Sequence, residues 1–543
     1  MKSRHFIWIV IIVNLVVFGQ SITHQLVWDD HAFIVNQDHS RFPTVKSLVD
    51  GSFPVPDTGS YRPIRNAVYG LTIPVFKTNP AYHHAFILLL HILCSWLVYR
   101  LLKLLTGHPS AAQFGALLFA VHPIHTESIH WVTAGYDLIF VSLYLAAILA
   151  HLNYQSGKNT RAWLSYLLAF LAMLSNEIAL TLPAMIMLID YFSQPKSRQL
   201  LNRPATYGSY WLLAGLYWLI RMIYITENPF AATVYPTLAG NALLGAYLFG
   251  QYVLQLFLPT ILNVDRLFFP GLTGLYSLNH SLTLPPPNLN LSNPSVAMPI
   301  GIAGIWLVMT IAGLIKKSVL ALPLIWVPLS LAAVLRIVPL PAIYSERYAY
   351  VASIGFIILL VLWLKPLFDK PAAKPILIGL FGLYFAYFTL LSFGRSQDWQ
   401  NDFVLWTKTL SQNQQSATAA SSLGVQYFVM GDMAESLRYH RQAITLNPYV
   451  SSYQQNYVSI LVKLGRYDDI IDFVNVILKT DAKNVNLYTI LASTYDAKGE
   501  YDPAMANYQT AYDLSLQGSG QRAEIEKLVD DLDRKYKVVD ETP

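Results

Sequence analysis

Twelve apolar stretches occupy the first three quarters of the chain and constrain its fold more than any other feature. They approach the roughly 20 residues that a helix needs to cross the hydrocarbon core of a bilayer. Charged residues make up only 13% of the 543 residues, well below the roughly 25% that is usual in globular proteins. The sequence therefore predicts an all-α, polytopic membrane domain. The stretches cover residues 5–23, 84–105, 110–121, 131–152, 162–175, 178–194, 206–225, 238–263, 297–315, 319–338, 346–364 and 374–393.

Clusters of lysine and arginine orient these stretches, because cytoplasmic loops retain basic residues. Neighbouring clusters are separated by an even number of stretches, except between Arg203 and Lys316, where three stretches lie. We predict that 238–263 is the one that does not cross, because glycines and a proline interrupt it. This leaves about eleven transmembrane helices, a cytoplasmic N-terminus and an extracytoplasmic C-terminal domain. The one cysteine, Cys94, excludes an internal disulfide framework.

A soluble helical region is predicted from residue 411 onward, where the composition changes. Gly431, Gly465 and Gly499 recur at intervals of 34 residues, which is the period of tetratricopeptide repeats. Such a solenoid offers a concave groove for an extended peptide, or serves as a spacer or an oligomerisation arm. The predicted repeats are 417–450, 451–484 and 485–518, with a capping helix at 520–537 and a linker at 397–410 before them.

Two adjacent carboxylates, Asp29 and Asp30, open the long loop 24–83 that follows the first apolar stretch. Neighbouring side chains diverge in both strands and helices, so the two cannot point at one atom. One carboxylate can act as a base toward an acceptor hydroxyl while the other orients it, binds a metal or holds the loop backbone. A helix-end cap or a solvated loop is the alternative.

A second polar group comprises His122, His125 and Glu127, which fall within six positions at a predicted helix turn. These side chains can contact a phosphate, position an acceptor or cap the turn. His125 and Glu127 are also candidate ligands for a divalent metal, although their spacing matches no dedicated metal motif.

Arginines near the predicted external helix ends suit bidentate contact with a phosphate leaving group. Pairing with nearby acids is the alternative for any one of them. The aromatic residues that we nominate for stacking on a sugar are Trp131 and Tyr136. The phosphate candidates are Arg62, Arg221 and Arg347, and the supporting candidates are Asp137, Asn176, Glu177 and Tyr348.

The order of these motifs resembles that of the transmembrane and tetratricopeptide-repeat O-mannosyltransferases and their prokaryotic relatives, a branch of the GT-C glycosyltransferases. The resemblance covers nearly the whole chain. Its blocks are Trp28-Asp29-Asp30, Tyr61-Arg62-Pro63-Ile64, the stretch from Phe119 to Glu127, Asn176-Glu177 and the stretch from Ser345 to Tyr350.

The resemblance implies an inverting transfer of one sugar, usually mannose, from a polyprenyl phosphate to a serine or threonine hydroxyl. It implies that Asp29 or Asp30 is the base or orients the base. Contacts with the donor phosphate and the active site are implied for Arg62, His125, Glu127 and Arg347.

Two positions depart from the family pattern, and each lacks a positive charge. Asn176 stands where the family usually has a lysine before Glu177. Tyr136 stands where an arginine commonly precedes Asp137.

These inferences divide the chain into a GT-C-type transmembrane glycosyltransferase domain, 1–396, whose loop 24–83 is catalytic, and an extracytoplasmic tetratricopeptide-repeat domain, 411–543. The expected partners are a polyprenyl-phosphate-linked sugar, an acceptor protein held in the repeat groove and the lipid bilayer. A divalent metal is the one candidate cofactor besides the lipid-linked donor, and no nucleic acid is expected.

We expect a bacterial inner membrane with the repeats in the periplasm, or an endoplasmic reticulum membrane with luminal repeats. The alternative functions are a GT-C enzyme that glycosylates a lipid or a cell-surface glycan, and a non-catalytic membrane scaffold.

Overall fold

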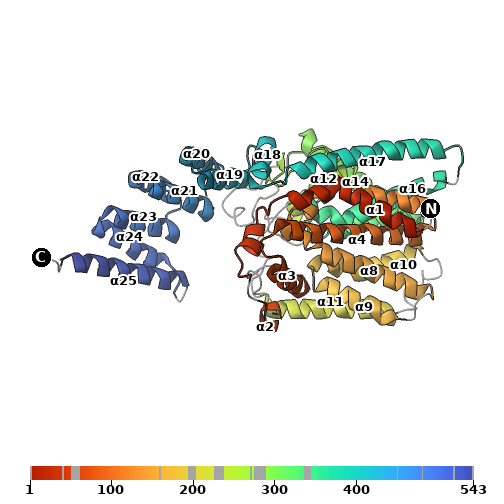
Figure 1. Cartoon of the computed structure of the whole chain (residues 1–543), viewed down its shortest axis with the longest axis horizontal. Coiled ribbons are helices and arrows are strands. Elements are labelled where there is room, and N and C mark those ends of the chain that lie inside the picture. Colours follow the sequence, from red (N-terminus) through yellow and green to blue (C-terminus); the bar gives the residue numbers. More distant parts are fainter. Residues whose placement is uncertain are drawn as a thin grey trace. The chain divides into compact units, whose positions relative to one another are not determined.

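The chain folds into two compact units, Met1–Asn413 and Gln414–Pro543, and both consist almost entirely of helices (Figure 1). Strands β1 (Leu267–Phe269) and β2 (Leu272–Thr273) pair antiparallel in the first unit, with Leu267 opposite Thr273 and Phe269 opposite Leu272. The computed structural model describes residues 3–39, 42–49, 61–157, 161–193, 204–225, 238–269, 272–273, 289–335, 344–368, 370–448, 450–479, 481–517 and 520–540.

Each of the twelve predicted apolar stretches contains a helix. The helices are α1 (Ser3–Phe18), α4 (Pro80–Thr106), α5 (Pro109–Ala120), α8 (Leu138–Gln155), α9 (Ala162–Met173), α10 (Leu182–Ser193), α11 (Pro204–Tyr224), α12 (Leu238–Phe257), α14 (Pro294–Ile315), α15 (Ala321–Leu331), α16 (Ala349–Phe368) and α17 (Lys374–Gln397).

Six helical segments within the described ranges are long and apolar enough to cross a membrane, as expected of a multi-pass membrane protein. Helices α9 and α15 are apolar but shorter, and α12 is not one of the six, so the count of about eleven crossings stays a prediction. The six segments are His5–Thr23, Pro80–Thr106, Val132–Gln155, Pro294–Ile315, Glu346–Phe368 and Lys374–Gln397.

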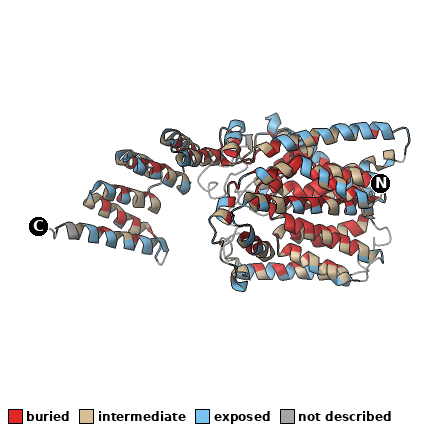
Figure 2. Cartoon of the chain, viewed as in Figure 1, coloured by how far each residue is buried: buried red, intermediate tan, exposed pale blue. Residues whose placement is uncertain are grey.

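The core of the first unit lies around α4, which packs against α1, α5, α8 and α16. Buried residues fill the interior of this bundle, whereas outward faces remain exposed (Figure 2). Leu307 on α14 and Leu383 on α17 are examples of large apolar side chains on these exposed faces. Such apolar faces are suited to contact with the hydrocarbon of a lipid bilayer.

Helices α12 and α14 touch through their backbones at Gly250. A Cβ atom at this position would overlap the backbone oxygen of Pro299. Glycine is therefore required for this close approach. That the stretch 238–263, which contains α12, does not cross the membrane stays a prediction.

Short helical segments connect the long helices and carry the polar motifs. These are η1 (Gly19–Thr23), η2 (His31–Val35), α2 (Val45–Val49), α3 (Pro63–Phe76), η3 (Pro123–His125), α6 (Thr126–His130), α7 (Val132–Gly135), η4 (Glu177–Thr181) and η7 (Glu346–Tyr348). Residues 40–41 and 50–60 of the predicted catalytic loop lie outside the described residues.

The segment that the sequence predicts as a linker, 397–410, contains most of a further helix, α18 (Asp402–Gln412). This helix belongs to the first unit, because the division between the units falls after Asn413. Its Leu405 and Trp406 side chains are buried. The segment is therefore packed structure rather than a bare connection.

The second unit consists of paired helices in its described part. Each predicted repeat range contains two of them, and Gly431 and Gly499 end the first helix of their pairs in the left-handed conformation that favours glycine. Assignment to tetratricopeptide repeats stays a prediction. The helices are α19 (Ala417–Met430), α20 (Met433–Leu446), α21 (Ser451–Lys463), α22 (Tyr467–Leu478), α23 (Val485–Lys498), α24 (Tyr501–Leu514) and α25 (Gly520–Asp540).

Candidate active site

Asp30 is fully buried, and all of its described contacts hold the first loop in place. Its Oδ1 atom accepts hydrogen bonds from the backbone N–H (2.7 Å) and the hydroxyl (2.6 Å) of Thr133. Its Oδ2 atom accepts from the Val27 N–H at 3.1 Å. Burial raises the pKa of Asp30 to about 7, although these hydrogen bonds act in the opposite direction. Asp30 thus ties the loop to the start of α7.

Asp29 is partly exposed, and its carboxylate makes no hydrogen bond or ion pair with any residue that the structure describes. Burial raises its pKa, and the positive charge of Arg347 partly offsets that effect. The two neighbouring carboxylates therefore diverge, as the sequence predicted. One is saturated with donors, and the other is available to an incoming group.

Trp28, which precedes this pair, is held between aromatic rings. Its backbone is left-handed, with φ at 56°. Its ring stacks on Trp131, with centroids 4.3 Å apart, and meets Trp406 edge-on at 5.2 Å. The guanidinium of Arg347 lies over the Trp131 ring, 4.6 Å from its centroid. Trp131 is buried by these groups, and Tyr136 is buried against Tyr69. Neither ring therefore has the open face that the predicted stacking on a sugar requires.

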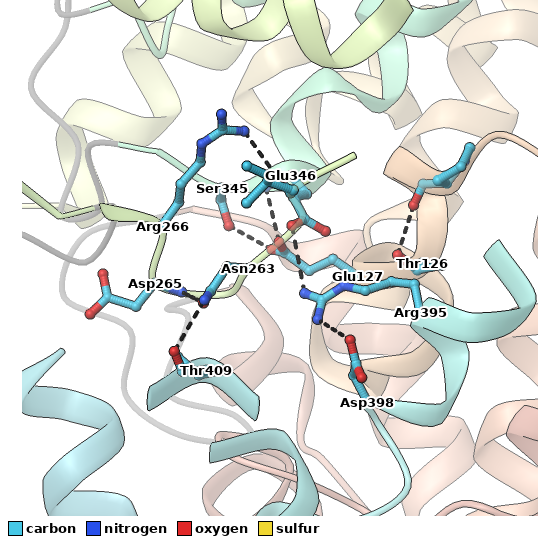
Figure 3. Close-up of polar contacts among 12 residues, drawn as sticks. Thr126, Glu127, Asn263, Asp265, Arg266, Ser345, Glu346, Arg395, Asp398 and Thr409 are labelled. Atoms are coloured by element: carbon cyan, nitrogen blue, oxygen red, sulfur yellow. Dashed lines mark hydrogen bonds and ion pairs between the residues drawn. The ribbon is translucent and has the colours of Figure 1, made fainter. Parts of the chain in front are cut away.

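Glu127 is buried and organises the start of η7, where helix α6 meets the segment before α16 (Figure 3). Its Oε1 atom accepts from Arg347 Nη1 at 2.6 Å and from the Ser345 hydroxyl at 2.5 Å. Its Oε2 atom accepts from the Glu346 N–H at 2.9 Å. The Nε and Nη2 groups of Arg347 have no hydrogen-bond partner in the described part of the chain. Arg347 is anchored at one nitrogen and retains free donors.

Further buried ion pairs lie next to Glu127. Glu346 is fully buried, and its Oε1 atom lies 3.6 Å from Arg395 Nη2. Arg395 also pairs with Asp398, at 2.9 Å. Figure 3 shows the Arg395 guanidinium lying between the Glu346 and Asp398 side chains. The end of α17 is thereby joined to the start of α16.

Arg62 joins the other two predicted carboxylates. It donates from Nε to Glu177 Oε2 (2.9 Å) and from Nη2 to Oε1 (2.7 Å), and Nη1 lies 3.3 Å from Asp137 Oδ1. Arg65 lies 3.9 Å from the same Asp137 oxygen. Burial alone would raise the pKa of Glu177, but the charge and hydrogen bonds of Arg62 outweigh burial and lower it to about 2. Glu177 therefore stays ionised.

The two predicted histidines are buried in the bundle. His122 Nε2 lies 3.0 Å from the Leu256 carbonyl oxygen, and His125 Nε2 lies 2.9 Å from the Ser353 hydroxyl. Burial lowers the pKa of His122 to about 4 and that of His125 well below its usual value, so both rings are neutral. Their described contacts are those of a helix turn packed against its neighbours.

The predicted metal ligands turn to different partners. His125 faces Ser353, whereas Glu127 faces Ser345 and Arg347. Within the described ranges, there is no group of three or more His, Cys, Asp or Glu residues that could hold a metal ion.

The remaining predicted residues have mainly local contacts. Asn176 accepts from the Ile178 N–H at 3.0 Å and so caps η4. Tyr348 lies beside Arg347, with the guanidinium 5.0 Å from its ring centroid. Arg221 is buried near the end of α11.

Sequence reasoning missed Asp402, whose carboxylate reaches the first loop. Its Oδ1 atom accepts from the Trp28 N–H at 2.8 Å, and its Oδ2 atom lies 2.6 Å from His31 Nε2. Thr133 and Arg395 were also missed. The one available signal was that the predicted linker contains tryptophans, including Trp406, which are unusual in a solvated connection.

No family model matches the chain. Over 81% of its length it is 24% identical to a human protein named protein O-mannosyl-transferase TMTC3, and over 82% it is 23% identical to the mouse protein of that name. A shorter match, 29% identical over 33% of the chain, is to Drosophila melanogaster protein O-mannosyl-transferase Tmtc1. The chain spans about half the length of the two TMTC3 relatives.

These relatives are glycosyltransferases by name. The resemblance to the transmembrane and tetratricopeptide-repeat O-mannosyltransferases is therefore confirmed by curated proteins along most of the chain.

Proposed function

We propose that this chain is an inverting membrane glycosyltransferase that moves one sugar, mannose by similarity, from a polyprenyl phosphate to serine or threonine hydroxyls of extracytoplasmic proteins. The observation that carries the proposal is the unpaired state of the Asp29 carboxylate within the described part of the chain. This carboxylate has no partner among the described residues and lies within reach of the charge of Arg347, which has free donors. The names of the relatives support the reaction class.

Asp29 is the base in this proposal. It takes the proton of the acceptor hydroxyl while the hydroxyl oxygen bonds to the anomeric carbon of the sugar. Burial raises the pKa of Asp29, which makes the carboxylate a stronger base than an exposed aspartate. Asp30 does not compete for this role, because its two oxygens already accept three hydrogen bonds.

Arg347 is proposed to receive the leaving phosphate. As the anomeric carbon–oxygen bond breaks, its electron pair moves to the phosphate, and free guanidinium donors stabilise that charge. Glu127 holds Arg347 Nη1 at 2.6 Å and so fixes the direction of the remaining donors. Because the base and the leaving group act on opposite sides of the sugar carbon, one displacement inverts its configuration. This reaction assigns no role to a metal ion.

The wider arrangement is part of the same proposal. Residues 1–396 supply the glycosyltransferase domain with about eleven crossings, and 411–543 form tetratricopeptide repeats whose groove holds the acceptor protein. The paired helices and the left-handed glycines at 431 and 499 support the repeat assignment. The proposed setting is a bacterial inner membrane with periplasmic repeats.

The experiment compares purified wild type with Asp29→Asn and Asp30→Asn, using mannosyl-phosphoryl polyprenol as donor and extracytoplasmic proteins as acceptors. Intact mass is expected to show hexose additions with wild type. Asp29→Asn is expected to lose at least about 100-fold in rate at an unchanged melting temperature, because a positioned base contributes that much or more. Asp30→Asn is expected to lower the melting temperature, because its amide nitrogen would face a buried donor.

The other outcomes separate the alternatives. Retained protein transfer by Asp29→Asn would remove Asp29 as the base. Hexose appearing only on a lipid or a surface glycan would favour a GT-C enzyme with that acceptor. No transfer to either pool by wild type would favour the scaffold.

A further inference from the structure

Asp402 and the first loop are far apart in sequence and in direct contact in the fold. The Asp402 carboxylate accepts from the Trp28 N–H at 2.8 Å and lies 2.6 Å from His31. Trp28 and His31 flank the acidic pair on both sides. Asp402 is buried, and it lies in the first turn of α18, after the last apolar helix.

The backbone at Trp28 needs such a partner. Non-glycine residues rarely adopt a positive φ, and they keep it only where the surroundings hold them. Trp28 has a φ of 56°, an N–H bonded to Asp402, and a ring between Trp131 and Trp406. Both Asp402 and Trp406 belong to α18, so this one helix supplies the backbone partner and one of the two rings.

The direction of the next side chain depends on this conformation. Asp29 follows Trp28 directly, so the Trp28 dihedrals set where the Asp29 carboxylate points. The end of α17, which precedes α18, reaches the arginine side of the site, because Arg395 lies 3.6 Å from Glu346, the residue before Arg347. The Gln25 N–H donates to the Gln400 carbonyl oxygen at 2.9 Å. This is a backbone contact between the first loop and the segment that joins α17 to α18.

We propose that Asp402 is a positioning residue that fixes the left-handed turn at Trp28 and thereby aims Asp29 at the acceptor. The proposal rests on the proposed function, in which Asp29 is the base. Asp402 itself contacts neither the sugar nor the phosphate in this account; it acts through the loop. The segment 395–406 is thus a support for the active site, although its sequence suggests a connection between domains.

The test uses the full chain, purified in detergent, as Asp402→Ala, Asp402→Asn and Lys408→Ala. Lys408 is exposed on the same helix and is the matched control. With mannosyl-phosphoryl polyprenol, Asp402→Ala is expected to lower kcat roughly 10- to 100-fold while donor KM changes less than about two-fold, because a misplaced catalytic group costs rate rather than substrate binding. Asp402→Asn retains an oxygen that can accept from the Trp28 N–H and is expected to lose less.

Hydrogen exchange tests the contact between Asp402 and the Trp28 N–H independently of enzyme activity. The Trp28 amide is expected to exchange faster in Asp402→Ala than in wild type or Lys408→Ala, and Asp29→Asn is expected to leave it unchanged.

The proposal is overturned if exchange at Trp28 is unchanged in Asp402→Ala, or if kcat of Asp402→Ala equals that of Lys408→Ala. Should Asp402→Ala not fold, Asp402→Asn must still show a kcat loss at constant KM, or the proposal fails. An active Asp29→Asn enzyme would instead contradict the proposed base, and the exchange result would still decide the contact.

Discussion

At the scale of single residues, Asp29 and Asp30 show how the surroundings separate two identical side chains. Asp30 is fully buried and accepts three hydrogen bonds from Thr133 and Val27, so substitution there acts on the loop. Asp29 has no such donors among the described residues. The roles follow from the number of nearby donors and not from the residue type.

Replacing Arg347 by glutamine is expected to move the acid limb of the pH–rate profile to higher pH. Burial already raises the pKa of Asp29, and the Arg347 charge holds it down in part. Without that charge the ionised carboxylate is less favoured, so Asp29 takes up its proton at a higher pH and the rate falls sooner on acidification. The measurement is kcat/KM against pH for both proteins, because this ratio reports the ionisation of free enzyme.

Arg100→Gln is the matched control for this charge change. Arg100 is an exposed residue near the end of α4, so its loss is expected to leave the acid limb in place. If the acid limb does not move in Arg347→Gln, or moves to lower pH, the Arg347 charge does not act on the proposed base.

The acidic pair could be predicted from sequence as a pair, because its position after an apolar stretch is a local property. Its division of roles could not, since that depends on Thr133, which lies 103 residues away. The directions of His122 and His125 were equally out of reach. Local sequence places them on a helix turn but does not say which face packs into the bundle.

At the scale of elements, the contact between α12 and α14 depends on the absence of a side chain. A Cβ atom at Gly250 would overlap a backbone oxygen of Pro299, and a backbone cannot rotate away as a side chain can. Gly250 is one of the glycines that interrupt the apolar stretch 238–263 in the sequence. In the structure it permits two helices to touch.

Gly250→Ala is expected to destabilise the protein by about 1–3 kcal/mol or more, because overpacking must push α12 and α14 apart. Thermal unfolding in one detergent is the measurement. Gly304→Ala, on α14 with nothing within 4 Å of an added Cβ, is the control and is expected to unfold at the wild-type temperature or slightly above it. Equal melting of the two variants would mean that α12 and α14 are not in backbone contact.

Hydropathy predicted the positions of the long helices, because the length of an apolar stretch depends only on consecutive residues. It did not predict α18, because the stability of that helix comes from distant partners. Trp406 packs against Trp28, and Asp402 binds the same residue. An amphipathic segment whose partner lies near the other end of the chain reads as a linker when taken alone.

At the scale of the whole molecule, the proposed orientation places basic loops on one side of the membrane and the second unit on the other. Cys94 is the one cysteine in the sequence, and it is buried. Polar maleimides are therefore expected to leave wild type largely unlabelled, so single introduced cysteines can report the side of each loop.

Lys316→Cys is expected to be labelled only after the membrane is permeabilised, whereas Lys527→Cys is expected to be labelled in intact spheroplasts. Both positions are exposed. The reason is that the charge pattern keeps Lys316 in the cytoplasm, while the second unit follows an odd number of crossings. Labelling of both from the same side would show that the number of crossings between them is even and that the topology is wrong.

The contact between Trp28 and Asp402 also has a consequence for protein synthesis. The two residues are 374 positions apart, so at about 5–20 residues per second Trp28 is made roughly 20–75 s before its partner. Throughout that interval nothing from α18 can hold the Trp28 turn. The proposed catalytic loop is thus among the first parts translated and among the last to acquire its shape. A nascent chain that has not yet completed its membrane unit is expected to be inactive.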